Sequence, residues 1–224
     1  IVGRFIAKKP DGKLQNEEFY NVEGTSERLI EYDRNQAKLL DIRYAYDSVT
    51  VEAKEADGIT KYKVNIVDNL RHGPYIAYYP DGKPRVLSNY LHGQLNGPYS
   101  YYNSSGQVEF ESNFCMGKHH GTIKRYKLGK LWTEDQMVQD VSQGKSSTYY
   151  TNGKLERVNY SIDDAREGFD VRYAPDGTWM YKQYMYHNQV VSYTYRNATG
   201  QTITTSVNQL KNSPLVAYYP SGKV

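Results

Sequence analysis

The 224-residue sequence has one cysteine, two tryptophans and no long apolar run. Because Cys115 is alone, an intramolecular disulfide is excluded, which is compatible with the cytosol and does not exclude export. No apolar stretch approaches the roughly 20 residues of a transmembrane helix. The net charge of +3 arises from charges of both signs mixed along the chain. A nucleic-acid-binding protein usually concentrates its basic residues on one face, so we expect no nucleic-acid partner.

Motifs of catalytic and cofactor sites are also missing. The sequence contains no G-x-S-x-G, no H-E-x-x-H and no dinucleotide fingerprint. The run Gly144-Lys145-Ser146-Ser147 resembles the end of a phosphate-binding loop, but Gln139 occupies the place of the upstream glycine. A strand-like Thr148-Tyr149-Tyr150 follows where that loop requires a helix, so we interpret Gly144 as a turn glycine.

Two further clusters are weak candidates for chemistry. Cys115, His119 and His120 lack a fourth ligand, and adjacent histidines on a strand point to opposite faces. Asp163 and Asp164 form an acidic turn without the enclosed pocket that a catalytic carboxylate pair needs, so we interpret them as surface decoration. We therefore expect no enzyme, no cofactor and no metal site.

What the sequence does contain is a tight turn every 22 to 24 residues. Pro-Asp-Gly and Asn-Gly turns between alternating apolar runs indicate β-hairpins, because glycine accepts a positive φ without steric cost. A fixed period of this length indicates a repeat array. The turn series consists of Gly12, Asn35, Gly58, Gly82, Gly106, Gly129, Gly153, Gly177, Gly200 and Gly222, with Asn35 as the one change of residue type.

A second glycine series lies between these turns, at Gly73, Gly97, Gly121, Gly144 and Gly168. Each repeat is therefore predicted to be a strand, a tight turn, a strand and a looser turn. The predicted fold is all-β: a single-layer, twisted antiparallel β-hairpin array, a solenoid of about ten repeats. We expect one array over residues 1–224, with degenerate repeats at 1–69 and 178–224 and clear repeats at 70–177.

Strand alternation assigns the many tyrosines, 24 in all, to two faces. We expect one series to pack against neighbouring repeats: Tyr32, Tyr79, Tyr102, Tyr126, Tyr150, Tyr173, Tyr195 and Tyr219, together with positions such as Tyr20, Tyr90, Tyr160 and Tyr184. The residue before each turn tyrosine should point to the opposite face. Because tyrosine and arginine are favoured at binding surfaces, we predict a recognition strip on that face, formed by Tyr78, Tyr101, Arg125, Tyr149, Arg172 and Tyr218. An ordinary solvated face is the alternative.

The segments Leu91–Tyr102, Ser105–Gln107 and Asn113–Gly121 resemble MORN repeats, and more closely the bacterial variant N-G-K-x-H-G-x-W-x-Y-Y-x-x-N-G-x-L. Tyr75 and Tyr99 stand where this variant often has tryptophan. The resemblance implies a β-hairpin repeat fold and protein binding without catalysis. Many bacterial members are labelled as the antitoxin component of a toxin–antitoxin pair, and other MORN proteins act as scaffolds, dimerisation modules or membrane-proximal adaptors.

Two functions therefore stay open. The first is a protein-binding or scaffold repeat protein, in an antitoxin-like form or otherwise, with self-association through terminal strands as a further expectation. The second is a carbohydrate or cell-wall binder, although such repeats depend on a regular tryptophan and only Trp132 and Trp179 occur. The compartment stays open between the bacterial cytoplasm and, after removal of an N-terminal signal, the periplasm or envelope.

Overall fold

The computed structural model describes residues 3–20, 26–33, 35–43, 49–55, 57–68, 70–210 and 216–219. Most of these residues lie in antiparallel β-strands, and the helix α1 (Val207–Leu210) has four residues. The chain divides into two compact units, residues 1–108 with 114–117 and residues 109–113 with 118–224. The prediction of an all-β fold built from antiparallel hairpins is confirmed. Gly222 lies outside the described residues.

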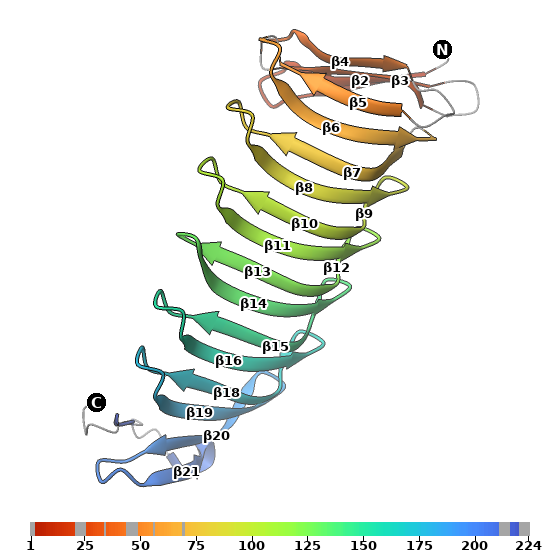
Figure 1. Ribbon diagram of the computed structural model, residues 1–224. Helices are drawn as coiled ribbons and strands as arrows, with labels where there is room; N and C mark the ends of the chain where they lie inside the picture. Colours follow the sequence, from red (N-terminus) through yellow and green to blue (C-terminus); the bar gives the residue numbers. More distant parts are fainter. Residues whose placement is uncertain are drawn as a thin grey trace. The chain divides into compact units, whose positions relative to one another are not determined.

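The first unit contains two runs of paired strands (Figure 1). Four strands form one sheet in chain order: β1 (Gly3–Lys8), β2 (Leu14–Tyr20), β3 (Ser26–Tyr32) and β4 (Lys38–Arg43). The next run consists of β5 (Val49–Lys54), β6 (Thr60–Val67), β7 (Leu70–Tyr78), β8 (Pro84–Leu91), β9 (Gln94–Leu95) and β10 (Gly97–Tyr102). Strand β8 pairs with both β9 and β10, so the short strand β9 forms the hairpin end and β10 continues the pairing along β8.

The second unit repeats this pattern. Its strands are β12 (Lys118–His119), β13 (Gly121–Lys127), β14 (Lys130–Val138), β15 (Val141–Tyr149), β16 (Leu155–Ile162), β17 (Ala165–Arg166), β18 (Gly168–Tyr173), β19 (Trp179–Tyr186), β20 (Gln189–Arg196) and β21 (Thr202–Ser206). Residues 109–113 of β11 (Val108–Cys115) belong to this unit, and Phe110 pairs with Arg125 of β13. The long strands pair antiparallel with their neighbours in chain order.

The tight turns have the local chemistry that their sequence predicts. In the turn after β7, the Tyr79 N–H donates to the Lys83 carbonyl at 2.8 Å and the Gly82 N–H donates to the Tyr79 carbonyl at 2.9 Å. Gly82 has a φ of +81°, which an L-residue rarely adopts. The assignment of Asn35 to this position was wrong by one residue. Gln36 has the positive φ, +67°, because the loop begins at Asp33, whose carboxylate accepts the N–H groups of Asn35 and Ala37.

The turns at the other ends of the strands differ from the looser turns that the second glycine series predicted. His92 and Gly93 both have positive φ and join the paired residues Leu91 and Gln94, which is a two-residue hairpin turn of the primed type. The glycines of the second series lie a few residues further on. Gly144, with φ +106°, lies inside β15 where the pairing with β14 shifts register, so it occupies a β-bulge and not a turn.

Apolar burial is concentrated in the first unit. Its core consists of Leu39, Leu40, Val51, Ala53, Tyr62, Val64, Ile66 and Ala77, so β4 packs against β5 to β7. The Tyr62 hydroxyl donates to the Glu31 carboxylate at 2.9 Å, and burial raises the pKa of Tyr62 well above its ordinary value. In the second unit several of the buried side chains are polar: Ser112, Ser147, Asn159, Asp170 and Thr194. Hydrogen bonds therefore carry more of the side-chain packing there.

Candidate interaction face

The pairing registers of the second unit align side chains from successive strands into rows. Directly paired residues of an antiparallel sheet point to the same side, about 5 Å apart. One row crosses seven strands, from β13 to β20, and consists of Arg125, Thr133, Thr148, Arg157, Arg172, Tyr181 and Tyr195. We call the side of the sheet that carries this row the arginine face.

A second row on the arginine face lies two residues along each strand from the first. It consists of Asp135, Ser146, Asn159, Asp170, Gln183 and Tyr193. The basic and aromatic groups are therefore set beside a parallel row of acceptors. This arrangement follows from the two-residue period of the strand and needs no loop to position it.

Ion pairs connect the two rows. Arg125 Nη1 lies 2.7 Å from Asp135 Oδ2. Arg157 binds Asp170 through two hydrogen bonds, of which Nε to Oδ1 is 2.8 Å long. The Arg157–Asp170 pair is the more enclosed: the Arg157 and Asp170 side chains are 19% and 4% exposed, whereas those of Arg125 and Asp135 are 44% and 28% exposed. The hydrogen bond to Asp170 raises the pKa of the Arg157 guanidinium above its ordinary value.

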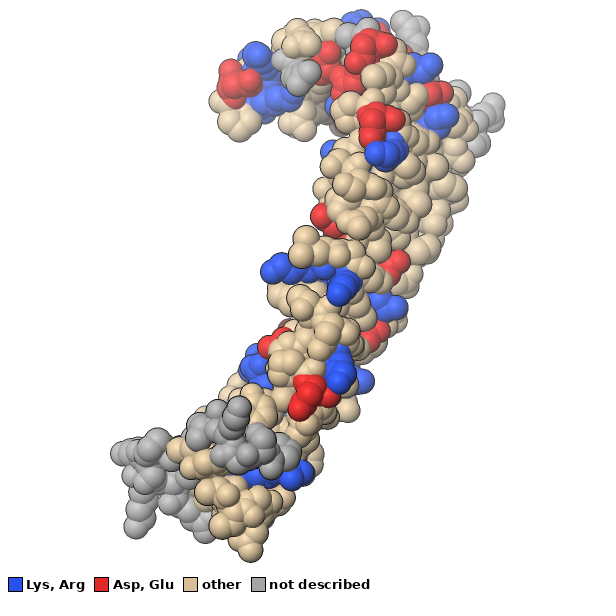
Figure 2. Space-filling model, turned by 60° about the vertical axis from the view of Figure 1, so that its left-hand side comes forward, with Lys and Arg blue, Asp and Glu red and all other residues tan. Residues whose placement is uncertain are grey.

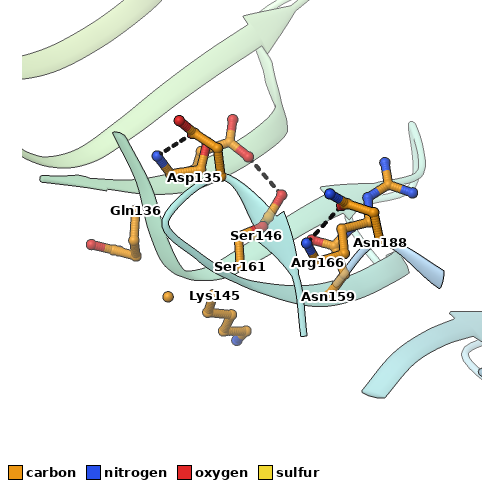
Figure 3. Close-up of a pocket in the computed structure, with 11 residues that line it drawn as sticks. Asp135, Gln136, Lys145, Ser146, Asn159, Ser161, Arg166 and Asn188 are labelled. Atoms are coloured by element: carbon orange, nitrogen blue, oxygen red, sulfur yellow. Dashed lines mark hydrogen bonds between the residues drawn. The ribbon is translucent and has the colours of Figure 1, made fainter. Parts of the chain in front are cut away.

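A polar cavity of about 240 Å³ lies beside the Gly144 bulge (Figure 3). Asp135, Ser146, Asn159, Asp164 and Arg166 are among its lining residues. The Ser146 hydroxyl donates to Asp135 at 2.6 Å, one of the hydrogen bonds drawn in Figure 3. None of the lining residues is aromatic, so the cavity has no ring on which a sugar could stack. Its shape and chemistry make it a polar recess at the edge of the arginine face.

Three turn residues spaced by 24 positions connect consecutive repeats. The Asp140, Asp164 and Asn188 side chains accept the backbone N–H groups of His119, Ser142 and Arg166, at 2.7, 2.7 and 2.8 Å. Sequence reasoning treated Asp164 as surface decoration and missed this role. The constant spacing of an Asp or Asn at the second turn position was the signal that could have shown it.

The predicted recognition strip does not lie on one face. Arg125 and Arg172 are members of the arginine row, and Tyr101 of the first unit is paired with Val86. Tyr149 follows a register shift after Thr148, and its hydroxyl reaches Glu134 on the opposite side of the sheet at 3.3 Å. Tyr78 likewise follows a register shift, which lies after Ala77.

The error has a local cause. The turn loop begins at the tyrosine itself in two repeats, at Tyr79 and Tyr150, but one residue after the tyrosine in others, at Asn103 and Ala174. Counting back from the tyrosine therefore changes the parity between repeats. Tyr218 is outside the strands, where its N–H donates to the Arg196 carbonyl at 3.1 Å.

Four of the tyrosines that were expected to pack show two different outcomes. The hydroxyls of Tyr79 and Tyr150 donate to the carbonyls of Tyr102 and Tyr173 in the next repeat, both at 2.7 Å. Tyr160 and Tyr184 were also expected to pack, and this was wrong, because they are 45% and 42% exposed. They lie near the turn where the strands bulge, and neighbouring side chains cover them incompletely.

The visible charges in one view of the molecule are mixed in sign. On the side of the molecule that Figure 2 shows, basic and acidic side chains occur close together among uncharged ones. Within the described ranges, no group of three or more Cys, His, Asp and Glu residues is arranged to hold a metal. The helix in the described part of the chain is too short to cross a bilayer.

Comparison with known proteins supports the repeat architecture. Residues 71–92, 95–116 and 142–161 each match the family described as the MORN repeat variant. MORN repeats are in general protein- or membrane-interaction repeats and non-catalytic. No protein of curated function matches the chain.

Alignments to solved structures have TM-scores too low to support an argument. The crystal structure of TcdB2-TccC3-Cdc42 aligns at 12% identity with a TM-score of 0.23, and that of TcdB2-TccC3 at 13% with 0.24. Each alignment covers 92% of this chain and 15% of the other, so the chain spans about a seventh of the length of these proteins.

Proposed function

We propose that this protein is a non-catalytic repeat protein that binds a protein partner through the arginine face. The observation that carries the proposal is the aligned row of three arginines and two tyrosines across seven strands. Arginine and tyrosine are enriched at protein interfaces and in their energetic hot spots. A scaffold and an antitoxin-like protein that holds one toxin are two narrower forms of this proposal.

The ion pairs orient the exposed arginine side chains of the row. Asp135 holds the Arg125 guanidinium from one side, and the side chain keeps 44% exposure, so further N–H donors stay available to a partner's carboxylate. Arg172 is 36% exposed and lies 3.7 Å from Glu156, a longer contact. Tyr181 and Tyr195 add half-buried aromatic area at low entropic cost. Arg157 is largely enclosed, so we assign it a supporting role.

The test is capture of the partner from the source cell with the tagged full chain. We expect one protein at near-stoichiometric yield, and loss of that protein with Arg125→Ala, Arg172→Ala and Tyr181→Ser combined. The matched control is Lys124→Ala, because Lys124 points to the opposite side of β13 from Arg125. Retention of the chain on purified wall glycans, with no stoichiometric protein, would contradict the proposal in favour of a carbohydrate binder.

A further inference from the structure

The side of the second unit opposite the arginine face carries a group of exposed apolar side chains. Tyr160 and Ile162 lie on β16, Phe169 on β18, and Tyr184 and Tyr186 on β19. Their exposures are 45%, 54%, 45%, 42% and 59%. The alternation of each strand places Tyr160 opposite in direction to Asn159, and Tyr184 opposite to Gln183. We call these five residues the aromatic patch.

The centre of the patch is a pair of rings in direct contact. Phe169 and Tyr184 are directly paired across β18 and β19, and their rings meet edge to face at 5.2 Å. At about 200 Å² per aromatic side chain and half exposure, the four aromatic residues present roughly 400 Å², and Ile162 adds to this area. This area is about that of the largest apolar patch on a typical monomer, and such patches are often functional.

Two lysines border the patch. Lys182 Nζ lies 4.5 Å from the centroid of the Phe169 ring, and Lys145 is paired with Tyr160 across β15 and β16. Lys145 is also among the residues that line the polar cavity, but its side chain extends away from Asp135 and Ser146 (Figure 3). Within the described part of the chain, neither lysine forms an ion pair. Glu167, a nearby acid at the end of β17, is bound to His187 through a backbone N–H at 2.8 Å and a ring nitrogen at 2.6 Å. Two cations therefore remain for an external anion.

This geometry distinguishes between ligand classes. Lys182 covers a face of Phe169, and the Phe169 and Tyr184 rings lie 73° apart, so they form no flat platform for a sugar or for consecutive bases. Two lysines are also few for a strand with one phosphate per nucleotide. Apolar area beside two free cations instead complements a peptide with alternating apolar and acidic side chains.

We propose that the aromatic patch is a second docking site, which binds an extended acidic peptide segment of a partner protein. The apolar side chains of that segment pack on Tyr160, Phe169 and Tyr184, and its carboxylates pair with Lys145 and Lys182. This site goes beyond the arginine face and uses the other side of the same sheet, so either site stands if the other fails.

The test measures binding of a fluorescently labelled glutamate–tyrosine copolymer to the full chain by fluorescence anisotropy. We expect Lys145→Glu with Lys182→Glu to weaken binding by about tenfold or more, because two attractive charge contacts become repulsive. Tyr160→Ser with Tyr184→Ser should weaken it comparably, and both residues are exposed enough for the fold to persist. Circular dichroism of each variant verifies folding.

A matched control lies in the same unit. Trp132 is 45% exposed and Lys127 Nζ lies 5.7 Å from its ring, so Trp132→Ser with Lys127→Glu removes a similar ring and charge elsewhere. We expect this variant to bind the copolymer as the wild type does. Equal binding of a lysine–tyrosine copolymer, tighter binding of labelled oligothymidylate, or unchanged binding by the patch variants would each overturn the proposal.

Discussion

The buried pair of Arg157 and Asp170 gives a sharp test of how the second unit is held together. The change is Asp170→Asn, which keeps the side-chain shape and removes the charge. Asp170 is 3% exposed as a residue, and the Arg157 side chain is 19% exposed. The variant therefore leaves a largely enclosed guanidinium without its counter-ion, and an amide oxygen is a weaker acceptor than a carboxylate.

The magnitude follows from the burial of the two groups. Breaking a fully buried ion pair by removing one partner costs about 3–5 kcal/mol, because the remaining charge stays desolvated. Arg157 keeps some contact with water, so we expect about 2–3 kcal/mol. The exposed pair Arg125–Asp135 on the same face is the matched control, and Asp135→Asn should cost less than about 1 kcal/mol. A double variant, Arg157→Met with Asp170→Leu, should recover most of the loss, because no charge is then buried.

The assay is amide hydrogen exchange on β16, β18 and β19, since unfolding of a repeat chain need not be two-state. We expect faster exchange on these strands in Asp170→Asn and near-wild-type exchange in the double variant. The reasoning is refuted if Asp170→Asn loses no more protection than Asp135→Asn. It is also refuted if the double variant is as destabilised as the single one.

Three further predictions concern single residues. Gly144→Ala should destabilise the β14–β15 pair by about 1–3 kcal/mol, because φ is +106°, a conformation that L side chains rarely adopt. Thermal unfolding measures the loss, and Gly3→Ala, at an ordinary φ, is the control. Tyr150→Phe should lower the free energy of unfolding by about 1 kcal/mol, because it removes the 2.7 Å hydrogen bond to the Tyr173 carbonyl. Chemical denaturation measures this change, and an unchanged free energy would refute a role of Tyr150 in joining repeats. Hydrogen bonds from Arg28 and Lys38 lower the pKa of Asp41 to about 2. The stability that the Asp41 carboxylate contributes is therefore present above about pH 4 and is lost as the pH falls from about 4 to about 2. In denaturation measured at a series of pH values, Asp41→Asn should lack this part of the acid transition.

The sequence was sufficient to predict the hairpins because their signals are local. A Pro-Asp-Gly turn such as the one at Gly82 is determined by the φ preferences of three adjacent residues, and its spacing predicts the next strand. The second turns were harder to predict. His92 adopts a positive φ that a histidine does not predict. Gly97, the glycine of the predicted series, lies further on, at the start of the strand β10.

The assignment of faces failed for a different physical reason. A strand has a period of two, so one inserted residue reverses the direction of every side chain beyond it. The shifts after Ala77 and Thr148 depend on where the turn loop closes, which differs between Tyr79 and Asn103 although both repeats contain a tyrosine pair. The packing of Leu39 and Leu40 on the β5–β7 strands is non-local and has no counterpart in the repeat pattern.

An exposed aromatic ring is weaker evidence for a binding site in this protein than it would be in a globular domain. The second unit buries few apolar side chains, among them Ile123, Val158 and Met185, so a half-exposed tyrosine is an ordinary consequence of its sheet. Trp132 is as exposed as Phe169 and has its own lysine, yet among the residues that the structure describes it has no ring partner of the kind that Tyr184 provides. Exposure alone therefore does not select the aromatic patch. The patch is selected by its cross-strand ring contact together with two lysines without ion pairs. For that reason the Trp132 variant is the control that decides between a surface formed by chance and a docking site.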